Sequence, residues 1–358
     1  MHPRFFGVML MDGEENSNSR GRKPKQSLRL TTESRIISMR AEKIESGWKR
    51  GRFAPSTTGR SHPGTLIAGL LCWLDARSAE REVLLRLEDL DVQRTKPGYV
   101  DQMRRDLEWF GLDWDVREIQ SEARERHDAA LEGLVAQGRI YACDCSRKQI
   151  RANGQLSPDG SYRYSGTCRD QVVSSSNWRS LDRPLRVRLD PLEIRLVDES
   201  GLDLSGNAAG LFGDPIVKRR DGVHAYHFAS VVDDGNAGVD RVVRGRDLAP
   251  STSLQVALQS VMGIPSPTYR HHLLFMERSG EKLSKLHGAV DLASLRPGLE
   301  ADELCGRLAA FVGLVQPGTR CRPRELVSTF DWARVRATDL ELAWDADRGL
   351  RPASIGTT

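Results

Sequence analysis

The stretch RFAPSTTGRSHPGT, residues 52–65, decides the fold of this chain. Its first residues predict a short strand, and a turn rich in Gly, Ser and Thr leads into the segment TLIAGLLCWLDARSAE. The apolar residues at 66, 67, 70, 71 and 74 have the spacing of a helix. The run VLLRLED, residues 83–89, is nearly continuous in apolar residues, as in a buried parallel strand. Strand, turn, helix and strand form a βαβ unit, which predicts an α/β fold with a parallel sheet.

Further elements follow along the chain. Val100, Met103, Leu107 and Phe110 share one face of a predicted helix, and STSLQVALQSVMG predicts another. The apolar runs HAYHFASVVDD (224–234) and VDRVVRGRDL (239–248) predict two further strands. We expect five segments: an extension (1–47), a first catalytic half (48–135), an insertion with small β elements (136–222), a second catalytic half (223–290) and a helical C-terminal region (291–358).

Composition places the chain among soluble globular enzymes. Of its 358 residues, 39% are apolar and 28% are charged, which argues against a disordered chain. It has no apolar run of about 18 residues, so we expect no membrane span. Six unevenly spaced cysteines are too few for a disulfide-built secreted fold, and the N-terminus lacks a signal-peptide core. We therefore expect a cytoplasmic protein.

The net charge of +4 is unevenly distributed. Residues 1–50 carry +5, so the rest of the chain sums to −1, and RNA contacts there must come from local patches. Residues 1–47 are polar and lack periodicity, which predicts disorder. They form either a solvated tail, a basic arm that touches RNA, or a segment upstream of a true start at Met39.

Two loops have the composition of phosphate sites. At the end of the first strand, His62 and Gly64 open a helix whose free N–H groups suit phosphate, although HPG alone is more often an ordinary βα loop. In GEKLSKLHG, residues 280–288, Lys282 and Lys285 can hold a polyphosphate as charge builds on its leaving oxygens. Alone, that loop is more often a solvated basic turn.

Together and in this order, the two motifs resemble the two signatures of class I aminoacyl-tRNA synthetases. RFAPSTTGRSHPGTL, LLRLEDLD and KLSK closely resemble the catalytic core of glutamyl-tRNA synthetases. GDPIVKRRDGVHAYHFASVVDD, GVDRVVRGRDL and the Cys-x-Cys insertion look like those of the glutamyl-queuosine tRNA(Asp) synthetases, a family of short paralogues without an anticodon-binding domain. The resemblance covers about residues 50–345. STTG stands where the family usually has SPTG, and the signature after it lacks its second His.

The resemblance implies a Rossmann-like parallel sheet with a zinc-containing insertion and a C-terminal helical region. It also implies activation of L-glutamate by ATP with Mg²⁺, then transfer to queuosine in the anticodon of tRNA(Asp). Such an enzyme works by positioning and charge stabilisation, without a covalent nucleophile. His62, Lys282 and Lys285 then take catalytic roles, and His62, Gly64, Ser284 and Lys285 bind ATP.

The family's glutamate site maps onto Arg52, Ser56, Glu88, Tyr226 and Arg244. The chemistry is sensible, since two arginines can bind two carboxylates, one carboxylate can take the ammonium, and hydroxyls can fix orientation. Each residue alone could equally be a surface or strand-end group. Their places at the ends of predicted strands favour a ligand site, but the sequence leaves open which arginine takes which carboxylate.

Three of the six cysteines cluster in the insertion. Cys143 and Cys145, at i and i+2 of an extended segment, point to one face, and Cys168 follows closely in sequence. Three thiolates suit zinc, and a fourth ligand closes a tetrahedral site, so we expect one Zn²⁺ per chain. The resemblance supplies Tyr164 as that ligand, with Tyr162, Asp144 or water as alternatives. Buried cysteines without a metal are the rival interpretation.

Two other functions compete with the main expectation. A conventional glutamyl-tRNA synthetase is disfavoured because about 70 residues follow KLSKL, too few for a stem-contact region and an anticodon-binding domain. A catalytically inactive zinc- and RNA-binding paralogue is disfavoured by the intact motif residues. We expect a monomer with L-glutamate, ATP and queuosine-containing tRNA(Asp) as substrates.

Overall fold

The computed structural model describes residues 36–38, 49–277, 291–345 and 349–353. Packing divides the chain into two units, Met1–Glu33 and Ser34–Thr358, and all described residues belong to the second. The predicted extension, apart from β1 (Ile36–Ser38), and the predicted KLSKL loop lie outside these ranges. None of the helices in the described ranges is both long and apolar enough to cross a membrane.

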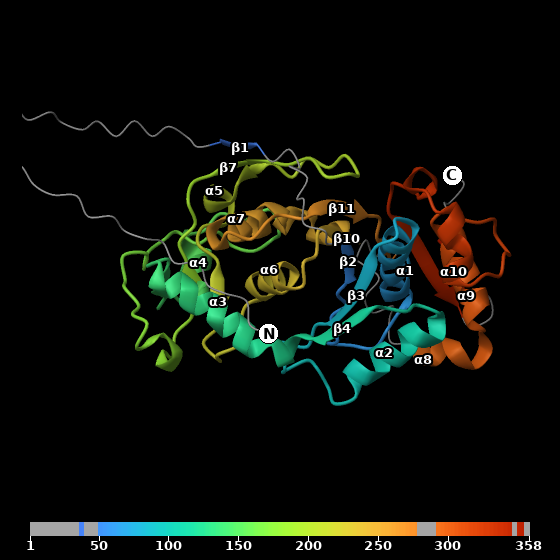
Figure 1. Cartoon of the computed structure of the whole chain (residues 1–358), viewed down its shortest axis with the longest axis horizontal. Coiled ribbons are helices and arrows are strands. Elements are labelled where there is room, and N and C mark those ends of the chain that lie inside the picture. Colours follow the sequence, from blue (N-terminus) through green and yellow to red (C-terminus); the bar gives the residue numbers. More distant parts are fainter. Residues whose placement is uncertain (1–35, 39–48, 278–290, 346–348, 354–358) are drawn as a thin grey trace, which may run out of the picture. The chain divides into compact units, whose positions relative to one another are not determined.

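Five parallel strands form the central sheet, in the order β11-β10-β2-β3-β4 (Figure 1). Their bounds are β2 (Arg50–Phe53), β3 (Glu82–Leu87), β4 (Val116–Ile119), β10 (Arg241–Gly245) and β11 (Thr268–His272). From β2 the chain adds β3 and β4 on one side, and it later adds β10 and β11 on the other. The strand order therefore reverses between β2 and β10, and the carboxyl ends of those strands border the crevice where open α/β sheets bind ligands. The predicted α/β class is confirmed.

Helices and short 3₁₀ turns connect these strands. They are α1 (Pro63–Ser78), α2 (Tyr99–Phe110), η1 (Gln120–Ala123), α3 (Arg124–Ala136), α6 (Tyr226–Asn236), η3 (Arg246–Ser251) and α7 (Thr252–Met262). The predicted helices that begin near residues 65, 100 and 251 correspond to α1, α2 and α7.

The two faces of the sheet bury separate cores. In β3, Val83, Leu85 and Leu87 join the core that contains α1, whereas Leu84 joins the core that contains residues of α6 and α7. Successive side chains of a strand point to opposite faces, so a strand covered on both sides is apolar throughout. This explains the continuous run VLLRL.

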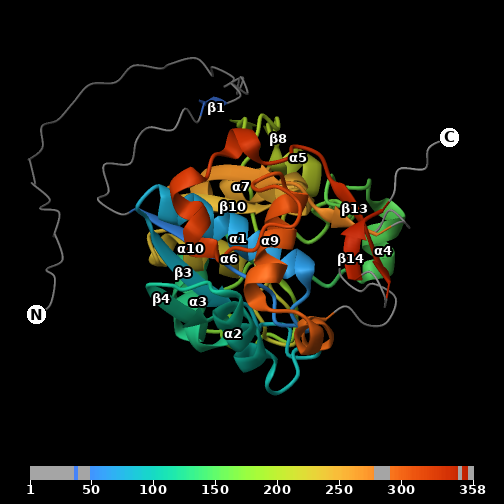
Figure 2. The same cartoon turned by 90° about the vertical axis from the view of Figure 1, so that its right-hand side faces the viewer.

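Helix α1 is buried over most of its surface because it lies between the sheet and the C-terminal region (Figures 1 and 2). It packs against β2, β3 and β10 on one side and against α9 and α10 on the other. Gly69 permits this close approach, since a Cβ there would lie 3.0 Å from Leu112 Cδ1 and 3.1 Å from Phe53 Cε1. The packed position of α1 fixes the loop that connects β2 to this helix.

The stretch 136–222 contains a small antiparallel sheet and short elements around it. The sheet has the order β5-β6-β9, with β5 (Ile140–Ala142), β6 (Leu185–Val187) and β9 (Ile216–Lys218). The other elements are α4 (Arg147–Asn153), η2 (Trp178–Ser180), β7 (Glu193–Arg195), β8 (Gly206–Asn207) and α5 (Ala208–Phe212). Strand β7 pairs with β8 antiparallel and with β1 parallel. The small β elements predicted for the insertion are present, and its boundaries stay predictions.

The C-terminal region is mainly helical, with strands that the sequence did not predict. Its elements are α8 (Leu292–Leu295), η4 (Arg296–Gly298), α9 (Ala301–Phe311), α10 (Pro323–Leu326), η5 (Val327–Thr329), η6 (Trp332–Arg334), β13 (Leu340–Asp345) and β14 (Gly349–Pro352), and β12 (Phe275–Met276) precedes the region. Strands β13 and β14 pair antiparallel, and β12 joins β13. Helix α9 contributes Leu304, Cys305 and Leu308 to the core that contains α1.

The strand predicted for residues 224–234 is wrong, because most of this stretch forms helix α6. All residues from Phe228 to Asp234 are buried. A short run that is covered on every side shows no period, so its pattern does not distinguish a strand from a helix.

Candidate active site

A cavity of about 350 Å³ opens at the carboxyl ends of β2, β3 and β10. The structure brings together at this cavity every predicted glutamate-site residue and both predicted residues of the HPG motif. They are Arg52, Ser56, His62, Gly64, Glu88, Tyr226 and Arg244. The cavity thus lies at the point where the strand order reverses, as expected for a ligand site of an open α/β sheet.

Backbone hydrogen bonds hold the turn after β2 against the end of β3. Glu88 N–H donates to Pro55 O (3.0 Å), and Thr57 N–H donates to Glu88 O (2.9 Å). The buried Thr57 hydroxyl donates to the same carbonyl (3.0 Å). Ser56 and Glu88 therefore form a parallel bridge and line the cavity together.

The HPG motif forms the first turn of α1. His62 is the N-cap residue in an extended conformation, Pro63 follows in the first turn, and the N–H groups of Thr65 and Leu66 donate to His62 O. A helix N-terminus carries a partial positive charge, and Gly64 adds no side chain to cover it. This end of α1 meets the cavity through His62, Gly64 and Thr65.

Arg244, at the end of β10, is buried among neutral partners. Its Nε donates to His271 Nε2 (3.1 Å), and its Nη1 donates to Gln255 Oε1 (2.6 Å). Its Nη2 donates to Thr252 Oγ1 (2.8 Å). Within the described residues it has no carboxylate partner, so its charge remains available to a ligand.

Arg52 and Glu88 belong to a buried charged network. Arg52 Nε lies 3.6 Å from Asp234 Oδ2 and makes no hydrogen bond to the described part of the chain. Arg86 forms an ion pair with Asp234 and lies 3.8 Å from Glu88 Oε1. Ser230 Oγ donates to Glu88 (3.3 Å). The network holds Arg52 and Glu88 in place while leaving polar atoms for a ligand.

Glu88 has an unusual proton affinity for a carboxyl group. Burial raises its pKa to about 7, Arg86 and Arg52 oppose the rise, and Asp234 and Asp233 add to it. An ammonium group beside this carboxyl would favour its ionised form.

Cys72 also lines the cavity, but its thiol is not a nucleophile. Burial raises its pKa to about 12, and its Sγ donates to Val243 O (3.1 Å).

Four residues that support this site were not predicted: Arg86, Ser230, Asp234 and His271. Three of them lie inside the motif stretches LLRLEDLD and HAYHFASVVDD, but each contacts a predicted site residue only through tertiary structure. Arg86 alone left a signal, since it is a charge inside the apolar run VLLRL. Lys282, Ser284 and Lys285 lie outside the described residues.

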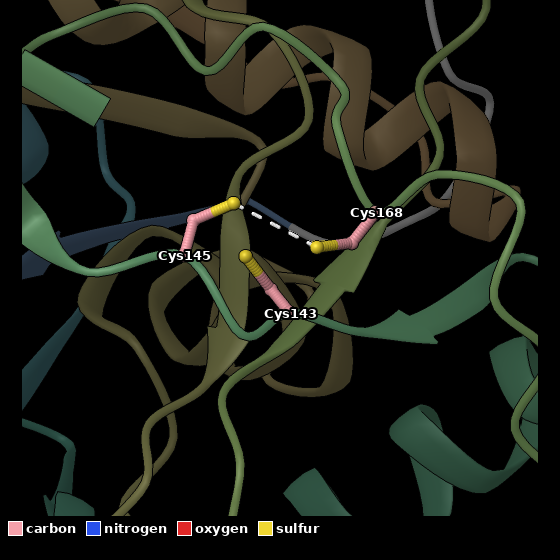
Figure 3. Close-up of side chains that lie close together, drawn as sticks. All are labelled: Cys143, Cys145 and Cys168. Atoms are coloured by element: carbon pink, nitrogen blue, oxygen red, sulfur yellow. Dashed lines mark hydrogen bonds between the residues drawn. The ribbon is translucent and has the colours of Figure 1, made fainter. Parts of the chain in front are cut away.

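The three cysteine thiols of the insertion point toward one another (Figure 3). Cys145 Sγ lies 3.7 Å from Cys168 Sγ, and Tyr164 Oη lies 3.5 Å from Cys143 Sγ and 3.7 Å from Cys145 Sγ. Among the described residues this is the one group of three or more Cys, His, Asp or Glu that could hold a metal ion.

The donor set has the dimensions of a tetrahedral zinc site. With Zn–S near 2.3 Å and Zn–O near 2.0 Å, tetrahedral angles place two sulfurs about 3.8 Å apart and a sulfur and an oxygen about 3.5 Å apart. The measured distances of 3.5 and 3.7 Å match these values. Asp144, an alternative ligand, instead accepts from Arg183 (2.7 Å), and Tyr162 stacks under Arg151. The three thiols therefore fit a zinc ion, and Tyr164 Oη lies near two of them.

Comparison with known proteins identifies the family of this chain. Residues 50–299 match the family described as tRNA synthetases class I (E and Q), catalytic domain. The Glutamyl-Q tRNA(Asp) synthetase of Nocardia farcinica is 40% identical over 292 residues, 80% of this chain and 90% of the relative. That of Thiobacillus denitrificans is 44% identical over 286 residues, 79% of this chain and 91% of the relative.

A solved glutamate tRNA ligase from Elizabethkingia meningosepticum, in complex with its amino acid, shares the fold. The TM-score is 0.67 at 24% identity, and the match covers 82% of this chain and 66% of the ligase. Fold, family model and relatives agree, and this chain belongs to the glutamyl-Q tRNA(Asp) synthetase family of the class I tRNA synthetases.

Proposed function

We propose that this chain activates L-glutamate with ATP, without tRNA, and transfers the glutamyl group to queuosine in the anticodon of tRNA(Asp). One observation carries the proposal: a single cavity holds two buried arginines, one buried carboxyl and the N-terminus of α1. The names of the relatives supply the acceptor.

The charges of the cavity complement glutamate. Two guanidinium groups and one carboxylate face two carboxylates and one ammonium, so each charge of the amino acid finds a partner of opposite sign. Arg52 and Arg244 take the carboxylates, and Glu88 takes the ammonium. Ser56 and Tyr226 supply hydroxyl groups that orient the bound molecule.

Activation is a displacement at phosphorus. An oxygen of the α-carboxylate attacks the α-phosphorus of ATP, a new P–O bond forms, and the bond to pyrophosphate breaks. His62 and the amides near Gly64 bind the nucleotide at the start of α1. Lys282, Ser284 and Lys285 stabilise the charge on the leaving pyrophosphate together with Mg²⁺.

Transfer is an acyl substitution. A hydroxyl of the cyclopentene-diol of queuosine attacks the carbonyl carbon of the adenylate and the ester forms; AMP leaves with the bonding electrons, and the hydroxyl proton passes to a phosphate oxygen of the departing AMP. Tyr226 stands where the acceptor must enter, since it is 37% exposed while Arg52, Glu88 and Arg244 are almost completely buried. An anticodon loop can present an unstacked base to such an opening.

The insertion holds one zinc ion through Cys143, Cys145, Tyr164 and Cys168. Zinc in such a closed four-donor site stabilises the local fold. Burial and the neighbouring thiols raise the pKa of Tyr164, and the Cys168 N–H that donates to Tyr164 Oη (2.8 Å) opposes this rise. The Arg186 guanidinium lies 3.7 Å from the centre of the Tyr164 ring.

A two-stage assay tests the function. Glutamate-dependent exchange of pyrophosphate into ATP should occur without tRNA. Labelled glutamate should then enter tRNA(Asp) that contains queuosine, and should enter neither tRNA(Asp) without queuosine nor tRNA(Glu).

Removal of the 3′-terminal adenosine separates the two possible acceptor positions. Transfer that survives this treatment supports the anticodon as target, and transfer that is lost with the adenosine would mean a conventional glutamyl-tRNA synthetase. Absence of exchange would mean an inactive paralogue.

A further inference from the structure

The partners of Arg244 differ in kind from those of Arg86, the buried arginine that supports the site from behind the cavity wall. Arg86 forms an ion pair with Asp234, which neutralises its charge within the protein. Among the described residues Arg244 instead donates to an imidazole, an amide and a hydroxyl, with a longer contact to Leu248 O (3.4 Å), and its guanidinium carbon lies 5.3 Å from the centre of the Tyr269 ring. Neutral acceptors orient a guanidinium without cancelling its charge, so this arrangement preserves attraction for a ligand carboxylate.

The contact with His271 requires one tautomer of the imidazole. Arg244 has only donors, so His271 Nε2 must carry a free lone pair and the proton must sit on Nδ1. His271 Nδ1 lies 2.8 Å from Asp198 Oδ2 and donates a hydrogen bond to it. Burial and the Arg244 cation lower the pKa of His271 to about 4, against the opposing effect of Asp198, so the ring is neutral near pH 7.

Asp198 is itself fixed by a tight turn between β7 and β8. Its Oδ1 accepts from the N–H groups of Ser200 and Leu202 (both 2.9 Å), and its Oδ2 also accepts from His271 N–H (2.8 Å). Burial raises the pKa of Asp198, but these donors outweigh it and hold the pKa below the usual value. The carboxylate is therefore ionised and has one orientation.

We infer that Asp198 and His271 are positioning residues for glutamate binding: Asp198 fixes the tautomer of His271, and His271 orients Arg244 toward the substrate carboxylate. The inference rests on the proposed function and extends it to residues outside the cavity wall. Asp198 comes from the insertion and Arg244 from the central sheet. The insertion thus completes the amino-acid site in addition to holding the predicted zinc.

Variants of His271 test the acceptor role directly. In His271→Leu the volume is nearly kept and the acceptor is lost, whereas in His271→Gln an amide oxygen can replace Nε2. Pyrophosphate exchange is measured against glutamate at saturating ATP and against ATP at saturating glutamate. The glutamate KM of His271→Leu should rise about tenfold or more, as for a lost hydrogen bond to a charged group, with the ATP KM within about twofold of wild type. His271→Gln should recover most of the loss.

Asp198→Asn tests the outer residue. An amide cannot accept on both sides of the turn, so either Ser200 and Leu202 or His271 loses its acceptor. The glutamate KM should rise less than in His271→Leu, and again without a matching rise for ATP.

Tyr269→Phe is the matched control. Tyr269 lies on the same strand, and its buried hydroxyl accepts from Gln259 (2.9 Å) rather than contacting Arg244. The change removes a buried hydrogen bond near the site but keeps the aromatic ring, which lies 5.3 Å from the Arg244 guanidinium, and keeps the hydrogen bonds of Arg244 to His271, Gln255 and Thr252, so the glutamate KM should stay within about twofold of wild type.

The outcomes separate the inference from the proposed function. Wild-type exchange with glutamate decides the function, and the ratio of glutamate KM values between variants decides the positioning role. An unchanged glutamate KM in His271→Leu, an equal rise for ATP, or a His271→Gln variant as impaired as His271→Leu overturns the inference even when the wild type is active. A wild type without glutamate-dependent exchange overturns both.

Discussion

The carboxyl group of Glu88 should titrate near neutral pH, and glutamate binding should follow its ionisation. Burial raises its pKa to about 7 in the ligand-free site. Only the carboxylate attracts an ammonium group strongly, so a protonated Glu88 binds the substrate poorly. With this pKa, about 9% of the free enzyme is competent at pH 6 and about 91% at pH 8. The value of kcat/KM for glutamate should therefore rise about tenfold between these pH values and level off above them.

The assay is pyrophosphate exchange at saturating ATP and low glutamate, where kcat/KM reports ionisations of the free enzyme. The neighbours of Glu88 are Arg52, Arg86 and Tyr226, with Asp233 and Asp234 behind them. The variant Glu88→Gln lacks the titrating carboxyl group, so any slope that remains in its pH profile belongs to another group.

This variant keeps the size of the side chain but has no charge, so its profile should be flat from pH 6 to pH 8. Its activity at pH 8 should fall about tenfold or more below wild type, through the loss of a charged hydrogen bond. A flat wild-type profile, or an equal slope in Glu88→Gln, would refute the assignment of Glu88 to the ammonium.

Three further predictions concern the metal, the buried network and the pyrophosphate. Purified protein should contain about one zinc per chain by elemental analysis, and Cys145→Ser should lower that content while Cys72→Ser should not; equal zinc loss in both variants would contradict the site. Asp234→Ala leaves Arg86 without its closest carboxylate, so urea unfolding should show a loss of about 3–5 kcal/mol, and a loss below about 1 kcal/mol would mean that Arg86 is paired elsewhere. Lys285→Ala should slow adenylate formation by about a hundredfold or more with little change in glutamate binding by calorimetry, whereas a loss confined to glutamate affinity would contradict a role at the leaving group.

Local patterns predicted three strands of the central sheet, β2, β3 and β10, but not β4 or β11, and they failed at the buried stretch of residues 224–234. The helix of residues 63–78 and the strand of residues 82–87 carry their signals in local spacing. Residues 224–234 were predicted as a strand and form most of α6; residues 228–234 are all buried, so the sequence shows no helical period there. The strands β13 and β14 were missed, since their pairing depends on contacts made after the chain folds back.

The sequence by itself determined which residues could perform the chemistry. Cys143 and Cys145 share a face because successive side chains of an extended chain alternate. His62 precedes a helix because Pro63 suits the first helical position. These are local relations, so the order of residues is sufficient to predict them. Tertiary structure alone decided the proton affinity of Glu88 and the partners of Arg52 and Arg244. Desolvation depends on what covers a group, and the chain separations of 182 residues between Arg52 and Asp234 and 73 between Asp198 and His271 leave no pattern in the sequence.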